Sequence, residues 1–237
     1  MLIEGSLRSK KTSFLIDNYV KLINEGVSSD EILVLCLNSS KKQFFTDSVL
    51  KKITQPAIEG LNIKTFYGLV YSAISDNWPI IENEIKLGET KIIPNLCGLE
   101  VSQYIFKQSI KQADFSDYIS KINLLHQLFR RYSLIVQNDL TNKEVKERSE
   151  LLNEVFYKDA QKAIDDYKLK TLQYNSFDYL RQLAVLPQIY KKTEYFKDIQ
   201  YLFVDDADEF SYAFWKFIDA IMPQLKDYYI AYDKYGS

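Results

Sequence analysis

Cysteine and histidine are scarce in this sequence, which holds two Cys and one His among 237 residues. Cys36 and Cys97 form no CxxC pair, and a single His is too few to complete a zinc site with them. Cys36 lies in an apolar run and is expected to be a buried thiol. Thiols that stay free favour a reducing, cytoplasmic setting.

Glycine, proline and long apolar runs are also scarce. With 7 Gly and 5 Pro, the chain is not expected to contain long disordered linkers. No apolar run approaches the ~20 residues that span a membrane. Residues 1–4 lack a basic segment followed by an apolar stretch, so no signal peptide is expected. We therefore expect no membrane partner.

A basic excess is absent as well, since the formal net charge is -2. A free-standing nucleic-acid binder usually carries net positive charge, so any DNA contact must use a local patch or depend on other parts of the protein. What the sequence does have is large rings, with 18 Tyr and 14 Phe. These are enough for the core of one large α/β domain, or of one domain that carries an insertion.

Strand and helix patterns alternate at both ends of the chain. Apolar runs predict strands at residues 2–3, 31–37, 61–65, 201–204 and 228–232. Helix-period patterns between them predict helices at residues 14–23, 44–50, 66–74 and 210–221. We expect Gly26 to end the first helix, and Ser39 or Ser40 to cap the second. Strands separated by helices imply a parallel sheet that is covered on both faces.

The middle of the chain has a different pattern, with helix-period segments at 101–113, 118–136 and 143–170 and no convincing strand. We therefore expect an α/β domain made of residues 1–79 and 199–237, interrupted by a helical insertion at 80–198. Only five residues follow Tyr232 at the end of the last strand, which suggests that the natural protein continues.

A phosphate-binding loop is one interpretation of Gly5 to Thr12, which fits the pattern G-x-x-x-x-G-K-[ST] except that Lys10 replaces the second glycine. In such a loop, backbone N–H groups and a helix N-terminus surround the phosphates, and Lys11 reaches them. The alternative is an ordinary basic, serine-rich turn between a strand and a helix. On this segment alone, we favour the ordinary turn.

Paired acids follow the strand at 201–204. An apolar strand that ends in Asp205 and Asp206 is typical of a Walker B segment, in which the first carboxylate holds magnesium and the second acts on the attacking water. The alternative is an acidic helix start. The two interpretations are evenly balanced until the loop at Gly5 to Thr12 is considered, and together the segments favour a nucleotide site.

These segments together resemble the UvrD/Rep family of superfamily 1 DNA helicases over nearly the whole chain. Further similar segments follow in the family's order, at residues 31–39, 64–69 (T-F-H-G-L, with Tyr67 replacing His), 176–180 (D-F-x-D-L), 204–209 (V-D-E-A-Q-D) and 230–233 (G-D-x-x-Q). The resemblance implies an α/β, RecA-like P-loop NTPase fold, with a parallel sheet flanked by helices and an inserted all-helical subdomain.

The resemblance also implies ATP and Mg as cofactors, and single-stranded DNA as a partner. By position, nucleotide binding falls to Gly5, Ser9, Lys10, Lys11 and Thr12, metal binding to Thr12 and Asp205, water activation to Asp206, and DNA binding to Asn38, Ser39, Thr65 and Tyr67. We expect Phe66 to serve in helix packing. Lys41 and Lys42 form a basic pair of the kind that solvated helix faces carry.

Several positions depart from the family's pattern. Asp206 replaces the catalytic Glu, Asp208 replaces a Gln, and Gly236 stands near the place of the γ-phosphate-sensing Gln. We therefore expect no ATP hydrolysis at a useful rate. Two hypotheses remain open: a degenerate helicase motor domain of DNA repair or recombination that keeps nucleotide or DNA binding, and a non-catalytic scaffold that binds proteins of a repair complex.

Overall fold

Five parallel strands form one sheet within the part of the chain that the structure describes, in the order β1-β7-β6-β2-β3. The computed structural model describes residues 1–6, 9–53, 60–85, 93–111, 115, 121–151 and 157–234. The strands are β1 (Leu2–Gly5), β2 (Ile32–Cys36), β3 (Ile63–Thr65), β6 (Tyr201–Val204) and β7 (Asp227–Asp233). Every residue of β2 is buried, because helices cover both faces of the sheet. The predicted α/β class, with a parallel sheet flanked by helices, is confirmed.

Helices α1 (Lys11–Asn24) and α2 (Ser39–Lys52) pack on one face of this sheet. Tyr19 of α1 lies at the centre of that layer, with its ring edge-on to Phe45 of α2 at 6.1 Å and to Phe203 of β6 at 5.9 Å. Gly26 follows α1 with a φ of 90°, which is the left-handed conformation that ends many helices. The predicted end of the first helix is therefore confirmed.

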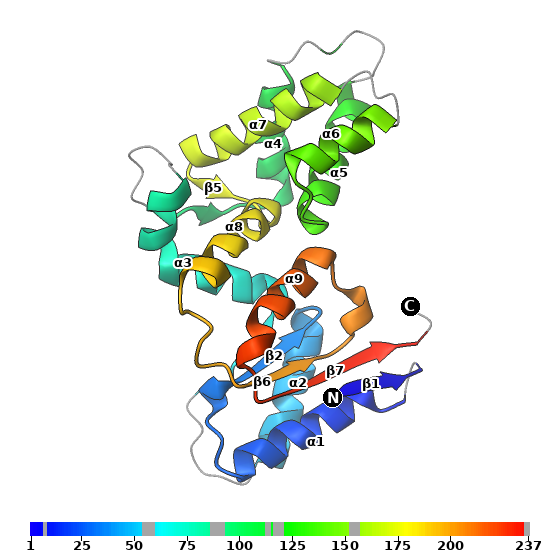
Figure 1. Cartoon of the computed structure of the whole chain (residues 1–237), viewed down its shortest axis with the longest axis vertical. Helices are drawn as coiled ribbons and strands as arrows, with labels where there is room; N and C mark the ends of the chain where they lie inside the picture. Colours follow the sequence, from blue (N-terminus) through cyan, green and yellow to red (C-terminus); the bar gives the residue numbers. More distant parts are fainter. Residues whose placement is uncertain are drawn as a thin grey trace. The chain divides into compact units, whose positions relative to one another are not determined.

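The other face is covered by α9 (Tyr212–Ile221) and the first turn of α3 (Phe66–Ile85), and Figure 1 shows α1 and α9 on opposite sides of the sheet. Phe66 is buried and its ring lies 4.9 Å from that of Phe214 and 5.8 Å from that of Phe217. The expected packing role of Phe66 is confirmed. Each such ring pair adds roughly 0.5–1.5 kcal/mol beyond the burial of its surface.

The register of the strands brings their carboxyl ends to one edge of the sheet. Gly5 of β1 lies opposite Asp233 of β7, and Cys36 of β2 lies opposite Thr65 of β3. Asp205 directly follows β6, and its N–H donates to the carbonyl of Leu35 at 3.2 Å. Five chain segments that are far apart in the sequence therefore end side by side. The thiol of Cys36 is buried in this region, and burial raises its pKa to about 12.

The remaining elements are mostly helical: α4 (Leu99–Ile110), α5 (Lys121–Gln137), α6 (Asn142–Leu151), α7 (Tyr157–Gln173) and α8 (Tyr179–Lys192). Two strands of two residues, β4 (Asn95–Leu96) and β5 (Ser176–Phe177), pair in parallel among them. The expectation of no strand in this region was wrong, because a two-residue strand is too short to show alternation. Short 3-10 turns complete the structure at Ser29–Glu31, Ala207–Glu209 and Met222–Gln224.

The chain divides into two compact units, one made of Met1–Ala73 and Ile189–Ser237 and the other of Ile74–Gln188. The first unit contains the sheet, and the second contains the helices α4 to α7. The divisions fall within the residue ranges of α3 and α8. No helix among the described residues is both long and apolar enough to cross a membrane.

A buried polar network holds the start of α8 in the helical unit. Asp178 accepts hydrogen bonds from the Tyr167 hydroxyl at 2.6 Å and from the Arg181 backbone N–H at 2.7 Å. The Arg181 side chain donates through Nε to the Thr171 hydroxyl at 3.0 Å and lies over the ring of Phe177. Burial raises the pKa of Asp178, so the network holds this carboxyl in a dry environment by hydrogen bonds.

Replacing Asp178 is expected to destabilise the protein. The Asp178→Ala variant leaves a buried hydroxyl and a helix N–H without their acceptor, and should lower the free energy of unfolding by about 1–3 kcal/mol. Asp178→Asn keeps one acceptor oxygen and should lose less. Urea unfolding followed by circular dichroism measures both variants. Equal stability of Asp178→Ala and the parent protein would contradict the assigned role.

Candidate functional site

Lys11 begins α1, and its ammonium group lies at the carboxyl edge of the sheet. Nζ donates hydrogen bonds to the backbone carbonyls of Gly5 at 3.0 Å and Ser6 at 3.1 Å, and to Oδ1 of Asp233 at 3.0 Å. The side chains of Lys11 and Asp233 are only 10% and 18% exposed. An ammonium group has three N–H donors. All three donors of Lys11 are used by oxygens at the ends of β1 and β7.

Thr12 and Asp205 form the second contact at this edge. The Thr12 hydroxyl donates to Oδ2 of Asp205 at 2.8 Å. Asp205 is 2% exposed, and its Oδ1 has no hydrogen-bond partner among the described residues. Burial raises the pKa of Asp205, and the negative charge of Asp206 raises it further. The fold therefore holds a carboxylate oxygen whose need for a cationic or protonated partner is not met by the described residues.

This pair fits the ligands that Mg²⁺ takes in phosphate sites. A hydroxyl and a carboxylate oxygen supply two ligands of a hard cation, and water and phosphate oxygens supply the rest. The described residues hold no group of three His, Cys, Asp or Glu that could bind a metal without such help.

Ser9 lies close to Gly5 ahead of α1. A Cβ atom on Gly5 would lie 2.2 Å from the Ser9 Oγ and 3.0 Å from the Ser9 Cβ, so a larger residue at position 5 would displace Ser9. The N–H of Ser9 donates to the Ser6 carbonyl at 3.1 Å. Leu7 and Arg8 lie outside the described residues, as does Gly236. The structure therefore describes both ends of the predicted phosphate loop.

Lys10 occupies the position where the phosphate-loop pattern has its second glycine. Its φ of 64° and ψ of 22° are left-handed, a conformation that glycine adopts without strain. Lys10 therefore has a backbone conformation that suits glycine, and its side chain is exposed. For a residue with a Cβ, that conformation costs roughly 1–2 kcal/mol.

Asp206 lies next to the Thr12–Asp205 contact, and it also has a left-handed backbone, with a φ of 53°. Its Oδ2 lies 3.0 Å from Nζ of Lys41 in the first turn of α2. The neighbouring Asp208 accepts a hydrogen bond from the backbone N–H of Asp233 at 2.9 Å. The carboxylate in the predicted water-activating position is thus paired with a lysine.

Sequence reasoning missed two residues of this site, Lys41 and Asp233. Lys41 is exposed on α2, as expected for half of a basic pair on a solvated helix face, and its ammonium also lies 3.0 Å from Oδ2 of Asp206. Asp233 has no predicted role, although it lies in the segment at residues 230–233 that is similar to G-D-x-x-Q. Its position at the end of a predicted strand, at the same edge as the loop, was the signal that could have identified it.

The predicted DNA-binding residues lie at the same edge, at the ends of β2 and β3. Asn38 caps α2 by accepting a hydrogen bond from the Lys41 N–H at 3.0 Å, so the prediction of Ser39 or Ser40 as the cap was wrong. Thr65 makes the matching contact at the start of α3, where its hydroxyl accepts from the Gly68 N–H at 3.0 Å. Ser39 is exposed in the first turn of α2.

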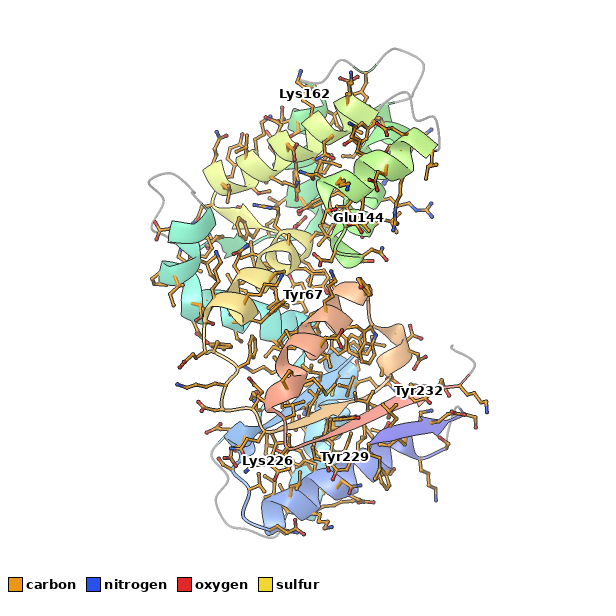
Figure 2. All side chains as sticks on the ribbon, viewed as in Figure 1. Tyr67, Glu144, Lys162, Lys226, Tyr229 and Tyr232 are labelled. Carbon is orange, nitrogen blue, oxygen red and sulfur yellow. The ribbon has the colours of Figure 1, made fainter. Side chains whose placement is uncertain are left out.

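Tyr67 lies in the first turn of α3, where Figure 2 labels it, and its side chain is half-buried. Tyr232, also labelled, lies near the far end of β7 and donates to Oε2 of Glu4 on β1 at 3.1 Å. Lys234 contacts the other oxygen of Glu4 at 3.0 Å. These contacts tie the ends of β1 and β7 together beside the Lys11 ammonium.

Restoring glycine at position 10 is expected to stabilise the protein. Lys10→Gly should raise the free energy of unfolding by ~0.5–1 kcal/mol, because relief of the left-handed strain exceeds the added entropy of an unfolded glycine. Lys10→Ala is the matched control, since it removes the long side chain and keeps the Cβ. Urea titration compares the two, and an equal gain in Lys10→Ala would show that backbone strain is not the cause.

A comparison with protein families found one match over nearly the whole chain. Residues 1–234 match the UvrD/REP helicase N-terminal domain. A comparison with curated proteins found no match. The family match agrees with the resemblance drawn from the motifs, and it indicates a helicase-type, ATP-dependent function on DNA. The chain therefore belongs to the UvrD/REP helicase N-terminal domain family.

Proposed function

We propose that the carboxyl edge of the sheet binds ATP together with Mg²⁺, as the nucleotide site of a helicase-type motor domain. The observation that carries this proposal is the meeting of the Lys11 ammonium, the Thr12 hydroxyl and the Asp205 carboxylate at one sheet edge. Ligands of open parallel sheets bind beyond the carboxyl ends of the strands, and the N-terminus of α1 adds a favourable field for phosphates.

Each residue has a role that follows from its present contacts. Lys11 would exchange its bonds to the Gly5 and Ser6 carbonyls for phosphate oxygens, and Asp233 would remain close enough to orient it. Gly5, Ser9 and Lys10 would shape the loop around the phosphates. Thr12 and Oδ1 of Asp205, which has no hydrogen-bond partner among the described residues, would hold Mg²⁺, which when bound neutralises phosphate charge.

Hydrolysis is expected to be slow in this chain. Asp206 stands in the position of the residue that acts on water, but Lys41 holds one of its oxygens at 3.0 Å. An aspartate also reaches one methylene less far than the glutamate that the family pattern has there. Because in-line phosphoryl transfer depends on positioning, a retracted and ion-paired base should leave binding intact and turnover low.

Single-stranded DNA is the proposed partner at the neighbouring strand ends. Asn38 and Ser39 after β2, and Thr65 and Tyr67 after β3, place polar groups and one ring along that edge. Ring stacking and backbone contacts suit single strands of mixed sequence. We propose a role in DNA repair or recombination, with proteins of a repair complex as further partners.

The nucleotide site is tested by thermal unfolding with millimolar Mg-ATP. The parent chain should gain ~1–2 kcal/mol of stability from the ligand, and Lys11→Ala should gain none. The quantity compared is the shift that ATP causes in each variant, since loss of the Lys11–Asp233 pair also lowers basal stability. Lys21→Ala, which changes an exposed lysine of the same helix, should respond as the parent does.

If ATP causes no gain in the stability of the parent chain, the proposed nucleotide site is contradicted. That result would favour the scaffold hypothesis, in which the fold serves protein partners only. An equal shift in Lys11→Ala and the parent would instead show that ATP binds elsewhere on the chain.

The DNA contact is tested by fluorescence anisotropy with a labelled oligo-dT strand at low salt. Tyr67→Ala should weaken binding by ~1–3 kcal/mol if a base stacks on the ring. Tyr71→Ala is the control, because Tyr71 lies one turn further along α3 and is 42% exposed. Equal weakening in both variants would locate the DNA contact elsewhere.

A further inference from the structure

Lys41 is held in place by its own helix start. Its backbone N–H is the donor that Asn38 accepts as the cap of α2, which fixes the first turn at the end of β2. From there Nζ reaches 3.0 Å from Oδ2 of Asp206, with side-chain exposures of 45% for Lys41 and 25% for Asp206. Pairing with Asp206 raises the pKa of Lys41 above its ordinary value.

The edge carries more carboxylates than one lysine could balance. Asp205 and Asp206 are adjacent, and Asp233 lies across the strand ends from them. Asp233 is paired with Lys11, and Asp206 is paired with Lys41. Without Lys41, two neighbouring carboxylates would face an incoming phosphate chain, and like charges at short range repel strongly where solvent is partly excluded. A divalent cation is the usual remedy for such repulsion.

We infer that Lys41 is a built-in counter-ion, which lets this site accept nucleotide phosphates with little dependence on a divalent metal. The inference rests on the proposed nucleotide site and adds a ligand requirement to it. It needs no movement of Lys41, since the ammonium already neutralises Asp206. The same contact explains how a site with eroded hydrolysis residues could still retain ATP.

In the family pattern, the two adjacent carboxylates hold magnesium and act on the attacking water. The pairing of Lys41 with Asp206 affects only the second of these tasks. Asp205 keeps an oxygen available for a cation. Asp206 has one of its two carboxylate oxygens, Oδ2, held by the Lys41 ammonium. Metal-tolerant binding and low turnover therefore follow from one ion pair.

The test compares ATP affinity in Mg²⁺ and in EDTA, by calorimetric titration of the full chain. The parent should lose less than about threefold in affinity when the metal is removed. Lys41→Met should bind nearly as well as the parent in Mg²⁺ and lose more than about tenfold in EDTA, which corresponds to ~1.4 kcal/mol. Lys42→Met is the matched control on the next residue of α2, and it should behave as the parent does.

A second variant distinguishes charge from structure. Adding Asp206→Asn to Lys41→Met removes the carboxylate that Lys41 balances, so the double variant should recover binding in EDTA. A purely structural role for Lys41 predicts no recovery. Thermal unfolding without ligand confirms that each variant is folded.

The outcomes separate this inference from the proposed function. If Lys41→Met and Lys42→Met respond alike in both buffers, or if the parent itself loses more than tenfold in EDTA, the counter-ion role is overturned and the nucleotide site stands. If the parent binds no ATP even with Mg²⁺, the proposed function fails and the inference fails with it.

Discussion

The pairing of β1 with β7 is the constraint on which the rest of the site depends. It joins residues near the two ends of the chain, and its register places Gly5 opposite Asp233. Only this pairing brings the first loop beside the end of the last strand, so that the Lys11 ammonium contacts both. The Tyr232–Glu4 hydrogen bond adds a side-chain tie across the same two strands. If β1 shifted by one residue, its alternating faces would exchange and the Lys11 contacts would be lost.

Burial and charge act against each other at this edge. Asp205 is held almost fully out of water by β6, β2 and Thr12, and that position raises its pKa. Asp206, one residue later, turns through a left-handed backbone toward Lys41 and so remains paired. Two adjacent acids thus have different partners because the chain direction changes between them. A cation or phosphate ligand would meet one available carboxylate oxygen on Asp205 and a pre-neutralised neighbour.

Much of the fold could be predicted from the sequence, because apolar periodicity reports burial directly. The strand at Tyr201–Val204 agrees with its predicted residues, and the end of α1 just before Gly26 follows from the left-handed backbone that glycine adopts. Beyond these, local pattern was not enough. Choosing Asn38 over its serine neighbours as a cap depends on where β2 stops, and the Lys41–Asp206 pair depends on a contact across 165 residues of sequence. The strands β4 and β5 are fixed by their pairing, not by their own residues.

The division of the chain has a consequence for its synthesis. Every residue of the helical unit has been made once Gln188 leaves the ribosome, whereas the sheet unit still waits for β6 and β7. Because domains fold as units during translation, the helical unit has all of its residues available for folding before the sheet unit does. Among the described strands, β1 pairs only with β7, so until β7 emerges its backbone groups lack that pairing and resemble an open sheet edge.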